Sequence, residues 1–329
     1  MTERPRVVVM GLAEARWPEG AKAVAEVVDL AFATSSESLA EALSQAEILF
    51  AWPSEDRGML PKAWGRAGRL RWIQTASDGV DWILFPQLVE SHVVLTNARR
   101  VFDSAVAEYV LGLMLVFAKG WVPMLDRQRR HEWRRRDTEL LAGKRLLVAG
   151  VGPIGRAIGR AGLALGMQVR GLGRSARPGD DVFERVHEAA ELPQAAGWAD
   201  YVVDVLPLTA ETRGMFDAEV FAQMRPNARF VNVGRGATVD EGALVQALRD
   251  GRIAGAALDV FEEEPLPADS PLWDLPNVIV SPHVSGDFAG WREAVVELFL
   301  ANLERYLTGQ PLENVVDKRL GYVVEPRLR

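Results

Sequence analysis

The sequence contains four histidines, the residue type best suited to exchange a proton near neutral pH: His92, His131, His187 and His283. His283 comes three residues after the apolar run Val278–Val280, at the carboxyl end of a predicted strand, where α/β sheets place their ligands. His131 and His187 lie in charged stretches and are expected to face solvent, and His92 is expected in a loop. Position alone would favour a structural role for any single histidine.

A glycine-rich turn follows the apolar run Leu146–Ala149 and precedes the helical segment Arg156–Leu165. The turn has the order G-x-G-x-x-G, formed by Gly150, Gly152, Pro153, Ile154 and Gly155. Its place between a strand and a helix indicates a dinucleotide-binding loop, and the alternative is a plain glycine-rich turn. Glycines permit the tight turn and the close approach of pyrophosphate, and the helix N-terminus supplies N–H donors.

The end of the next predicted strand, Gln168–Leu172, bears on the choice of cofactor. NAD-binding proteins normally place a carboxylate there to hold the ribose hydroxyls, but this sequence continues with Gly173, Arg174 and Ser175. Arg174, together with Arg177, could form charge-assisted hydrogen bonds to a 2′-phosphate. We therefore expect NADP(H) to be preferred and NAD(H) to be accepted; the alternative is an exposed arginine without specificity.

Composition excludes several classes of protein. Apolar residues make up 48%, charged residues 25%, and the formal charge is -7, as in a globular protein that does not bind nucleic acid. The chain has no cysteine and no histidine pair with helical ligand spacing, so we expect no thiolate chemistry and no metal. Met1–Arg6 lacks a signal-peptide pattern and Val110–Ala118 is too short to span a membrane, so a cytoplasmic location is expected.

The segments that must position these residues form two series of alternating strands and helices. The first-series strands are predicted at Val7–Met10, Val27–Phe32, Ile48–Ala51, Arg71–Ile73 and Val93–Leu95. The second-series strands are predicted at Arg145–Ala149, Gln168–Leu172, Tyr201–Leu206, Arg229–Val233, Gly255–Val260 and Val278–Val280. This rhythm predicts an α/β protein with two doubly wound parallel sheets.

Three further segments complete the expected architecture. Ser38 and Glu41 have capping-box spacing, which predicts a helix start at Ser38. Apolar residues recur at helical spacing over Phe102–Ala118, which predicts a long buried helix. The stretch Asp126–Asp137 contains six arginines and is interpreted as a solvated arm, with a binding patch as the alternative.

Beyond the glycine loop, three later segments carry a resemblance to a known family. They are Val231–Gly236, Leu258–Phe261 running on to Glu264–Leu266, and Ser281–His283. In order and spacing they resemble the D-isomer-specific 2-hydroxyacid dehydrogenases. Within that family the sequence most resembles the glyoxylate and hydroxypyruvate reductase branch, mainly through Gly173 and Arg174. The resemblance implies a Rossmann dinucleotide-binding domain, residues 99–286, inserted in a flavodoxin-like substrate domain, residues 1–98 and 287–329. It also implies a homodimer, for which the Asp126–Asp137 arm is a candidate contact.

The same resemblance assigns Arg235, Glu264 and His283 as catalytic residues for the reduction of a small 2-keto acid to a D-2-hydroxy acid. Histidine suits the donor of the proton that the substrate oxygen needs, and a nearby carboxylate favours its charged form. The arginine offers paired donors to the carboxylate and carbonyl of the substrate.

Further residues are assigned to ligands by the resemblance. Ser77, Asp78 and Gly79 correspond to a loop that binds the substrate carboxylate. Asp78 departs from the small residues usual there, and we expect it either near the anionic substrate or turned to solvent. The cofactor is expected to contact the catalytic arginine and histidine and also residues of three later segments, namely Pro207 and Thr212, Val233 and Gly234, and Asp259. Asp259 could instead cap the end of its strand.

Two other readings remain. Formate dehydrogenases share the fold but have glutamine where Glu264 stands, and a neutral amide suits a reaction without proton transfer. Some relatives act as cofactor-sensing corepressors, so a binding protein without significant turnover is the alternative to an enzyme.

Overall fold

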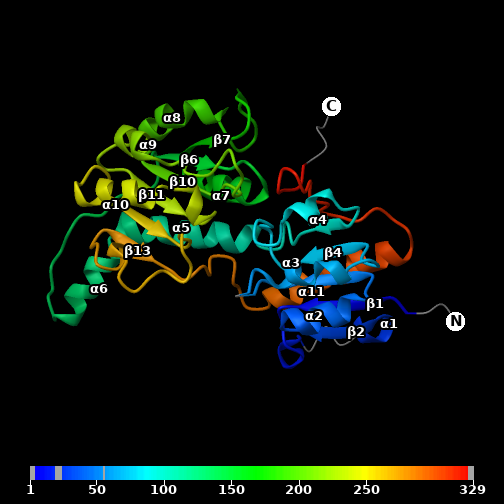
Figure 1. The fold of residues 1–329 in the computed structure, drawn as a ribbon. Helices are drawn as coiled ribbons and strands as arrows, with labels where there is room; N and C mark the ends of the chain where they lie inside the picture. The colour runs from blue at the N-terminus through cyan, green and yellow to red at the C-terminus, as the bar shows by residue number, and fades with distance from the viewer. Residues whose placement is uncertain (1–3, 19–23, 55, 325–329) are drawn as a thin grey trace. The chain divides into compact units, whose positions relative to one another are not determined.

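The computed structural model describes residues 4–18, 24–54 and 56–324, and the chain divides into two compact units. Unit 1 comprises Met1–Phe102 and Phe288–Arg329, and unit 2 comprises Asp103–Asp287 (Figure 1). The domain borders expected from sequence were 98/99 and 286/287, so residues 99–102 fall in unit 1 and residue 287 in unit 2. Residues 1–3 of the stretch assessed for a signal peptide lie outside the described part.

Unit 1 is built on a parallel sheet with the order β2-β1-β3-β4-β5, which is the flavodoxin-like order. Its strands are β1 (Arg6–Met10), β2 (Asp29–Ala33), β3 (Ile48–Ala51), β4 (Trp72–Thr75) and β5 (Val94–Thr96). Its helices are α1 (Val24–Val27), α2 (Ser36–Leu43), α3 (Met59–Ala63), α4 (Pro86–Glu90) and α11 (Trp291–Leu307).

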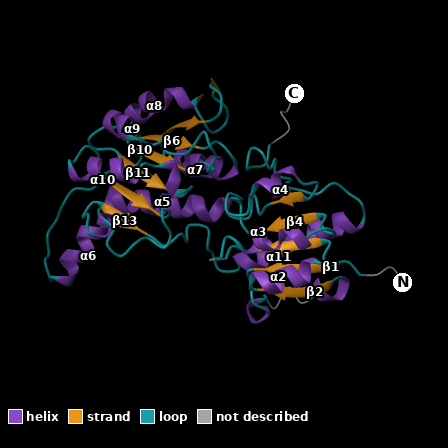
Figure 2. Ribbon diagram, in the orientation of Figure 1, coloured by secondary structure: helices purple, strands orange, loops and turns teal. Residues whose placement is uncertain are grey.

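Alternate residues of β1 enter two separate cores. Val8 packs in a cluster with Leu39 of α2. Val9 packs in a second cluster with Phe299 of α11, whose ring stacks on Phe50 at 4.4 Å between centroids. Helices therefore cover both faces of this sheet, which confirms the doubly wound prediction (Figure 2).

The predicted start of α2 was wrong by one turn. The N-cap is Ser35, whose hydroxyl accepts from the backbone N–H of Ser38, and the Ser38 hydroxyl accepts in return from the Ser35 N–H. Ser38 is thus the third helical residue of a capping box and not its first member. Serine at both positions gives the same reciprocal bonds as the usual serine and glutamate pair.

Unit 2 contains an eight-stranded sheet with the order β13-β12-β11-β10-β6-β7-β9-β8. Its strands are β6 (Arg145–Ala149), β7 (Gln168–Leu172), β8 (Arg177–Pro178), β9 (Arg185–His187), β10 (Tyr201–Asp204), β11 (Arg229–Asn232), β12 (Gly255–Leu258) and β13 (Val278–Val280). Only β8 pairs antiparallel among its described strands. From β9 to β12 the order is that of a Rossmann sheet, as predicted.

The prediction that His187 faces solvent was wrong. His187 is 4% exposed because it lies in β9, where it pairs with Leu172 of β7. Burial lowers its pKa, since the low-dielectric surroundings disfavour the charged ring.

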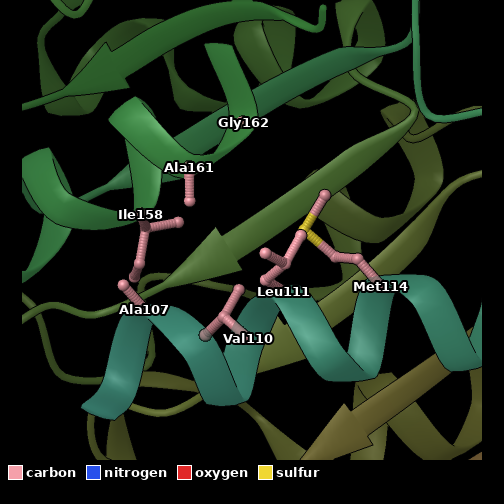
Figure 3. A pocket seen from close by; sticks show the side chains of 7 residues that line it. All are labelled: Ala107, Val110, Leu111, Met114, Ile158, Ala161 and Gly162. Carbon is pink, nitrogen blue, oxygen red and sulfur yellow. The ribbon is translucent and has the colours of Figure 1, made fainter. Parts of the chain in front are cut away.

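The helices of unit 2 are α5 (Asp103–Lys119), α6 (Trp121–Arg129), α7 (Pro153–Ala164), α8 (Leu192–Trp198), α9 (Ala218–Gln223) and α10 (Glu241–Arg249). Figure 3 shows Val110 and Met114 of α5 facing Ile158 of α7, with small residues, including Gly162, beside them. These side chains leave no room for a water molecule, so the long helix is held by close apolar packing.

The arm is exposed over residues 130–138, as expected of a solvated segment, although its first residues belong to α6. Among the described residues no single helix is long and apolar enough to cross a membrane; α5 and α6 pass that test only as a pair, bent by 62°.

Candidate active site

The glycine turn connects β6 to α7, and its glycines have different reasons to be glycine. Gly150 has φ +107°, and a Cβ there would lie 2.8 Å from the Val205 carbonyl oxygen. A Cβ on Gly155 would lie 1.8 Å from the Gly150 carbonyl oxygen. A Cβ on Gly152, the N-cap of α7, would meet no atom within 4 Å.

The fold itself therefore excludes side chains at Gly150 and Gly155, whereas Gly152 borders open space at the start of α7. Pro153 occupies the first turn, where its missing N–H costs nothing. Open space beside the N–H groups and positive end of a twelve-residue helix suits a pyrophosphate. The residues present thus fit a dinucleotide cofactor.

His283 and Glu264 form a close pair. The ring Nδ1 of His283 lies 2.8 Å from Oε2 of Glu264, and Oε1 of Glu264 accepts a hydrogen bond of 3.0 Å from the Phe261 N–H. An ionised carboxylate can only accept, so Nδ1 carries the proton of this bond and Nε2 is left for a substrate. The side chains are 48% and 25% exposed, which leaves the imidazole accessible.

Electrostatics connects Arg235 to this pair. Burial raises the pKa of Glu264, but the hydrogen bond and charge of His283 outweigh burial and hold that pKa below its ordinary value. The Arg235 guanidinium lowers it further. The structure thus brings the three predicted catalytic side chains into one electrostatic neighbourhood within unit 2, although they are far apart in the sequence.

The backbone around Arg235 is fixed by side-chain hydrogen bonds. Its carbonyl oxygen accepts from Asn232 Nδ2 at 3.1 Å and from the Thr238 hydroxyl at 2.6 Å. Asn232 also accepts from the Gly234 N–H at 2.9 Å. A Cβ on Gly234 would lie 2.9 Å from the Leu206 carbonyl oxygen, so this turn packs closely against the loop after β10.

The candidate substrate loop of unit 1, residues 77–79, is held by its own side chains. The Ser77 hydroxyl donates to the Gly79 carbonyl at 2.8 Å and accepts from Trp82 Nε1 at 2.9 Å. Asp78 accepts from Asn97 Nδ2 at 2.9 Å and is half-buried. Its carboxylate is therefore engaged with an amide of the same unit.

Comparison with known proteins decides the family. Residues 111–285 match the family described as D-isomer specific 2-hydroxyacid dehydrogenase, NAD binding domain. A glyoxylate/hydroxypyruvate reductase B from Pectobacterium atrosepticum is 37% identical over 261 residues, which cover 77% of this chain and 81% of the relative. The chain belongs to the D-isomer specific 2-hydroxyacid dehydrogenase family. It is an oxidoreductase that uses a nicotinamide dinucleotide.

Solved structures of this family are similar to the enzyme over nearly its whole length. A family protein from Aeromonas salmonicida is 33% identical with a TM-score of 0.83, covering 96% of this chain and 100% of its own. An NADPH-dependent glyoxylate/hydroxypyruvate reductase from Sinorhizobium meliloti, in complex with NADP and sulfate, is 28% identical with a TM-score of 0.82 and covers 97% and 100%.

Asp259 of the enzyme is engaged with the loop that carries His283. Its fully buried carboxylate accepts from the Ser281 hydroxyl at 2.7 Å, the Val284 N–H at 3.0 Å and the Ser285 N–H at 2.8 Å. These bonds bracket His283, whose φ of +54° is one that few non-glycine residues adopt. Asp259 thus stabilises the conformation that presents the imidazole.

The end of β7 carries no carboxylate, and Arg174, Ser175 and Arg177 are exposed. Arg177 donates to Asp180 at 2.9 Å, and Asp180 also accepts from Arg156 of α7 at 2.8 Å. Burial raises the pKa of Asp180, but these bonds and backbone donors outweigh burial and lower it strongly. Arg177, one of the two predicted phosphate ligands, therefore already has an internal anionic partner.

The loop that follows β10 is closed on itself. The Thr212 hydroxyl donates to the Pro207 carbonyl at 2.7 Å, and Thr212 is buried. Sequence reasoning missed two buried residues of this region, Asp204 and Thr238, which contact each other. The sequence shows there a single acidic residue after the apolar run Tyr201–Val203, a pattern that ordinary turn residues share.

Proposed function

We propose that the enzyme reduces a small 2-keto acid, such as glyoxylate or hydroxypyruvate, to the D-2-hydroxy acid with NADPH. The observation that carries this proposal is the 2.8 Å pair between His283 Nδ1 and Glu264 Oε2, with the charge of Arg235 acting on the same carboxylate. The names of relatives support the substrate class, since several are glyoxylate/hydroxypyruvate reductases.

In this proposal the bound nicotinamide supplies a hydride to the keto carbon. As that bond forms, the carbonyl π electrons move to oxygen, and the Nε2 proton of His283 neutralises the developing alkoxide. Glu264 favours the charged ring and fixes its orientation through Nδ1. Arg235 binds the carboxylate and carbonyl oxygens, and the backbone N–H groups of Ser77, Asp78 and Gly79 bind the carboxylate, which holds the carbon for attack.

The preference for NADPH is proposed from the end of β7. The absence of a carboxylate there removes repulsion toward a 2′-phosphate, and Arg174 supplies a positive charge. Ser175 can donate a hydroxyl hydrogen bond, and Arg177 adds charge despite its bond to Asp180. The pyrophosphate would lie at Gly150–Gly155, and the remaining cofactor contacts are assigned to Pro207, Thr212, Val233, Gly234 and Asp259.

A homodimer is proposed as the working form. Several large apolar side chains of α6 and of the segment that follows it are exposed, which is costly for an isolated chain. They are Trp121, Val122, Leu125, Trp133 and Leu140. Sedimentation of the wild type and of a Trp121→Glu variant would test this assignment, with a monomeric wild type contradicting it.

Steady-state assays test the function. Purified enzyme is supplied with NADPH and, separately, with glyoxylate, hydroxypyruvate, pyruvate and a bulkier 2-keto acid, and the chirality of any chiral product is determined. We expect glyoxylate and hydroxypyruvate to give the highest kcat/KM, and hydroxypyruvate to give the D product. An L product, or no turnover of any 2-keto acid, would refute the proposal.

A further inference from the structure

Asp204 is a carboxyl group inside unit 2 for which the proposed reaction has no use. It ends β10 and is fully buried. Its Oδ1 accepts a hydrogen bond of 3.0 Å from the Leu206 N–H, and its Oδ2 contacts the hydroxyl of Thr238. Thr238 is also buried, and its hydroxyl lies 2.6 Å from the carbonyl oxygen of Arg235. A chain of three oxygens thus joins Asp204 to the backbone of a proposed catalytic residue.

The number of hydrogens that these three oxygens can carry determines whether Asp204 is protonated. A threonine hydroxyl has one hydrogen, and a carbonyl oxygen can only accept. If Thr238 donates to the Arg235 carbonyl, the contact with Asp204 requires a proton on the carboxyl group. If Asp204 is ionised, it takes the Thr238 hydrogen, and two oxygens without a hydrogen between them are left 2.6 Å apart at Arg235.

The surroundings of Asp204 favour the protonated form. Burial raises its pKa to about 7, although the bonds from Thr238 and Leu206 lower it in part. Among the residues that the structure describes, no charged group contributes to this pKa, and the neighbouring strands place Ala149 and Asn232 beside Asp204. The charged groups on the elements packed around Asp204 either have partners of their own or are exposed. Arg235 donates to the Gly234 carbonyl, Asp259 accepts from the loop that carries His283, and Glu241 accepts from the Glu262 N–H. Glu219 and Arg249 lie at the surface, and α8 contains no charged residue.

We infer that protonated Asp204 is a positioning residue, which holds the Arg235 turn through Thr238 and so sustains binding of the substrate carboxylate. Ionisation of Asp204 withdraws the Thr238 hydrogen from the Arg235 carbonyl and loosens the turn, so that substrate affinity falls as pH rises. The inference rests on the proposed role of Arg235. It adds a buried proton, separate from that of His283, to the groups that control activity.

The variant Asp204→Asn mimics the protonated acid at all pH values. Its amide nitrogen can donate to Thr238, while its oxygen keeps the Leu206 N–H. We expect the ratio of wild-type KM to variant KM for the 2-keto acid to rise about fivefold between about pH 6 and pH 8, the effect of about one hydrogen bond. Because the ionisation of His283 is common to both proteins, it cancels in this ratio. A ratio that stays constant with pH would overturn the inference.

Changes at Thr238 test the same chain from its other side. Thr238→Ser keeps the hydroxyl and should keep the wild-type pH dependence, whereas Thr238→Val should raise KM at acidic pH and remove the dependence. The effect should fall on KM more than on kcat, because His283 and Glu264 are untouched. A Thr238→Val enzyme with the wild-type pH profile of KM would contradict the coupling, even if Asp204→Asn fails to fold.

Two readouts that need no turnover separate this inference from the proposed function. The unfolding midpoint of the wild type should fall relative to Asp204→Asn as pH rises from about 4 to 7 and level off above, since the folded carboxyl holds its proton longer than the unfolded one. Binding of oxamate to the enzyme with NADP should show the same pH-dependent ratio as KM. If the enzyme reduces no 2-keto acid but both the unfolding midpoint and oxamate binding show the expected pH dependence, the proposed function is rejected and the inference stands. If the difference in midpoint between wild type and Asp204→Asn does not change with pH, the proton on Asp204 is rejected.

Discussion

Replacing Glu264 by glutamine removes one charge beside His283 while preserving size and the acceptor for the Phe261 N–H. The atoms Oε2 and Nδ1 are 2.8 Å apart. Both side chains are partly exposed, at 25% and 48%, so a dielectric constant near that of water applies. Coulomb's law then gives about 1.5 kcal/mol for the attraction between carboxylate and imidazolium, equivalent to about a tenfold change in rate.

Glu264→Gln should therefore lower kcat/KM for the 2-keto acid by about tenfold. The direction follows because the carboxylate stabilises the charged ring that donates the proton, whereas a neutral amide does not. Glu263→Gln removes the same charge from the neighbouring exposed residue and should leave kcat/KM nearly unchanged. A Glu264→Gln enzyme with the wild-type kcat/KM, or an equal loss in Glu263→Gln, would contradict this role of Glu264.

Three further predictions concern the cofactor loop and the buried carboxyl. Arg174→Ala should lower the ratio of NADPH to NADH efficiency by at least about tenfold, the value of one hydrogen bond between charged groups, and an unchanged ratio in steady-state assays would contradict the phosphate assignment. Gly152→Ala should keep the wild-type melting temperature yet weaken cofactor binding, because its Cβ enters the open space at the start of α7. Gly155→Ala should lower the melting temperature by several degrees, because its Cβ would lie 1.8 Å from the Gly150 oxygen. Calorimetry and cofactor titration of both variants check this contrast. Between about pH 4 and pH 7, Asp204→Asn should gain about 3 kcal/mol of unfolding free energy over the wild type in urea titrations, because the unfolded carboxyl releases its proton above a pKa of 3.8 whereas the folded one keeps it up to a pKa of about 7. Equal pH dependences of the two proteins would contradict the burial of Asp204 as an acid.

Strands with apolar residues and clear flanking signals were predictable from the sequence. The bounds of β6, β7 and β13 agree with those expected, and the fold class is confirmed. β9 was not predicted because Val186 alone of its three residues is apolar. Its burial comes from pairing with β7, a tertiary contact that local pattern does not reveal, and the error at His187 follows from the same cause.

The residues of the candidate site likewise fall into those that the sequence predicted and those that only the structure shows. Family motifs marked Arg235, Glu264 and His283, and the structure adds the contact between the last two. Asp204 and Thr238 are 34 positions apart, and their contact depends on the neighbouring places of β10 and β11 in the sheet. An aspartate at a strand end has the pattern of an ordinary turn residue, so no local signal distinguishes a buried acid there.

His283 is the residue proposed to deliver the proton during reduction of a 2-keto acid. The most direct measurement compares the wild type with His283→Asn in single-turnover oxidation of NADPH by glyoxylate, with cofactor binding followed separately by fluorescence. We expect the rate to be lower by about a hundredfold or more in the variant, which should still bind NADPH. A variant that reduces glyoxylate within a few-fold of the wild-type rate would contradict it.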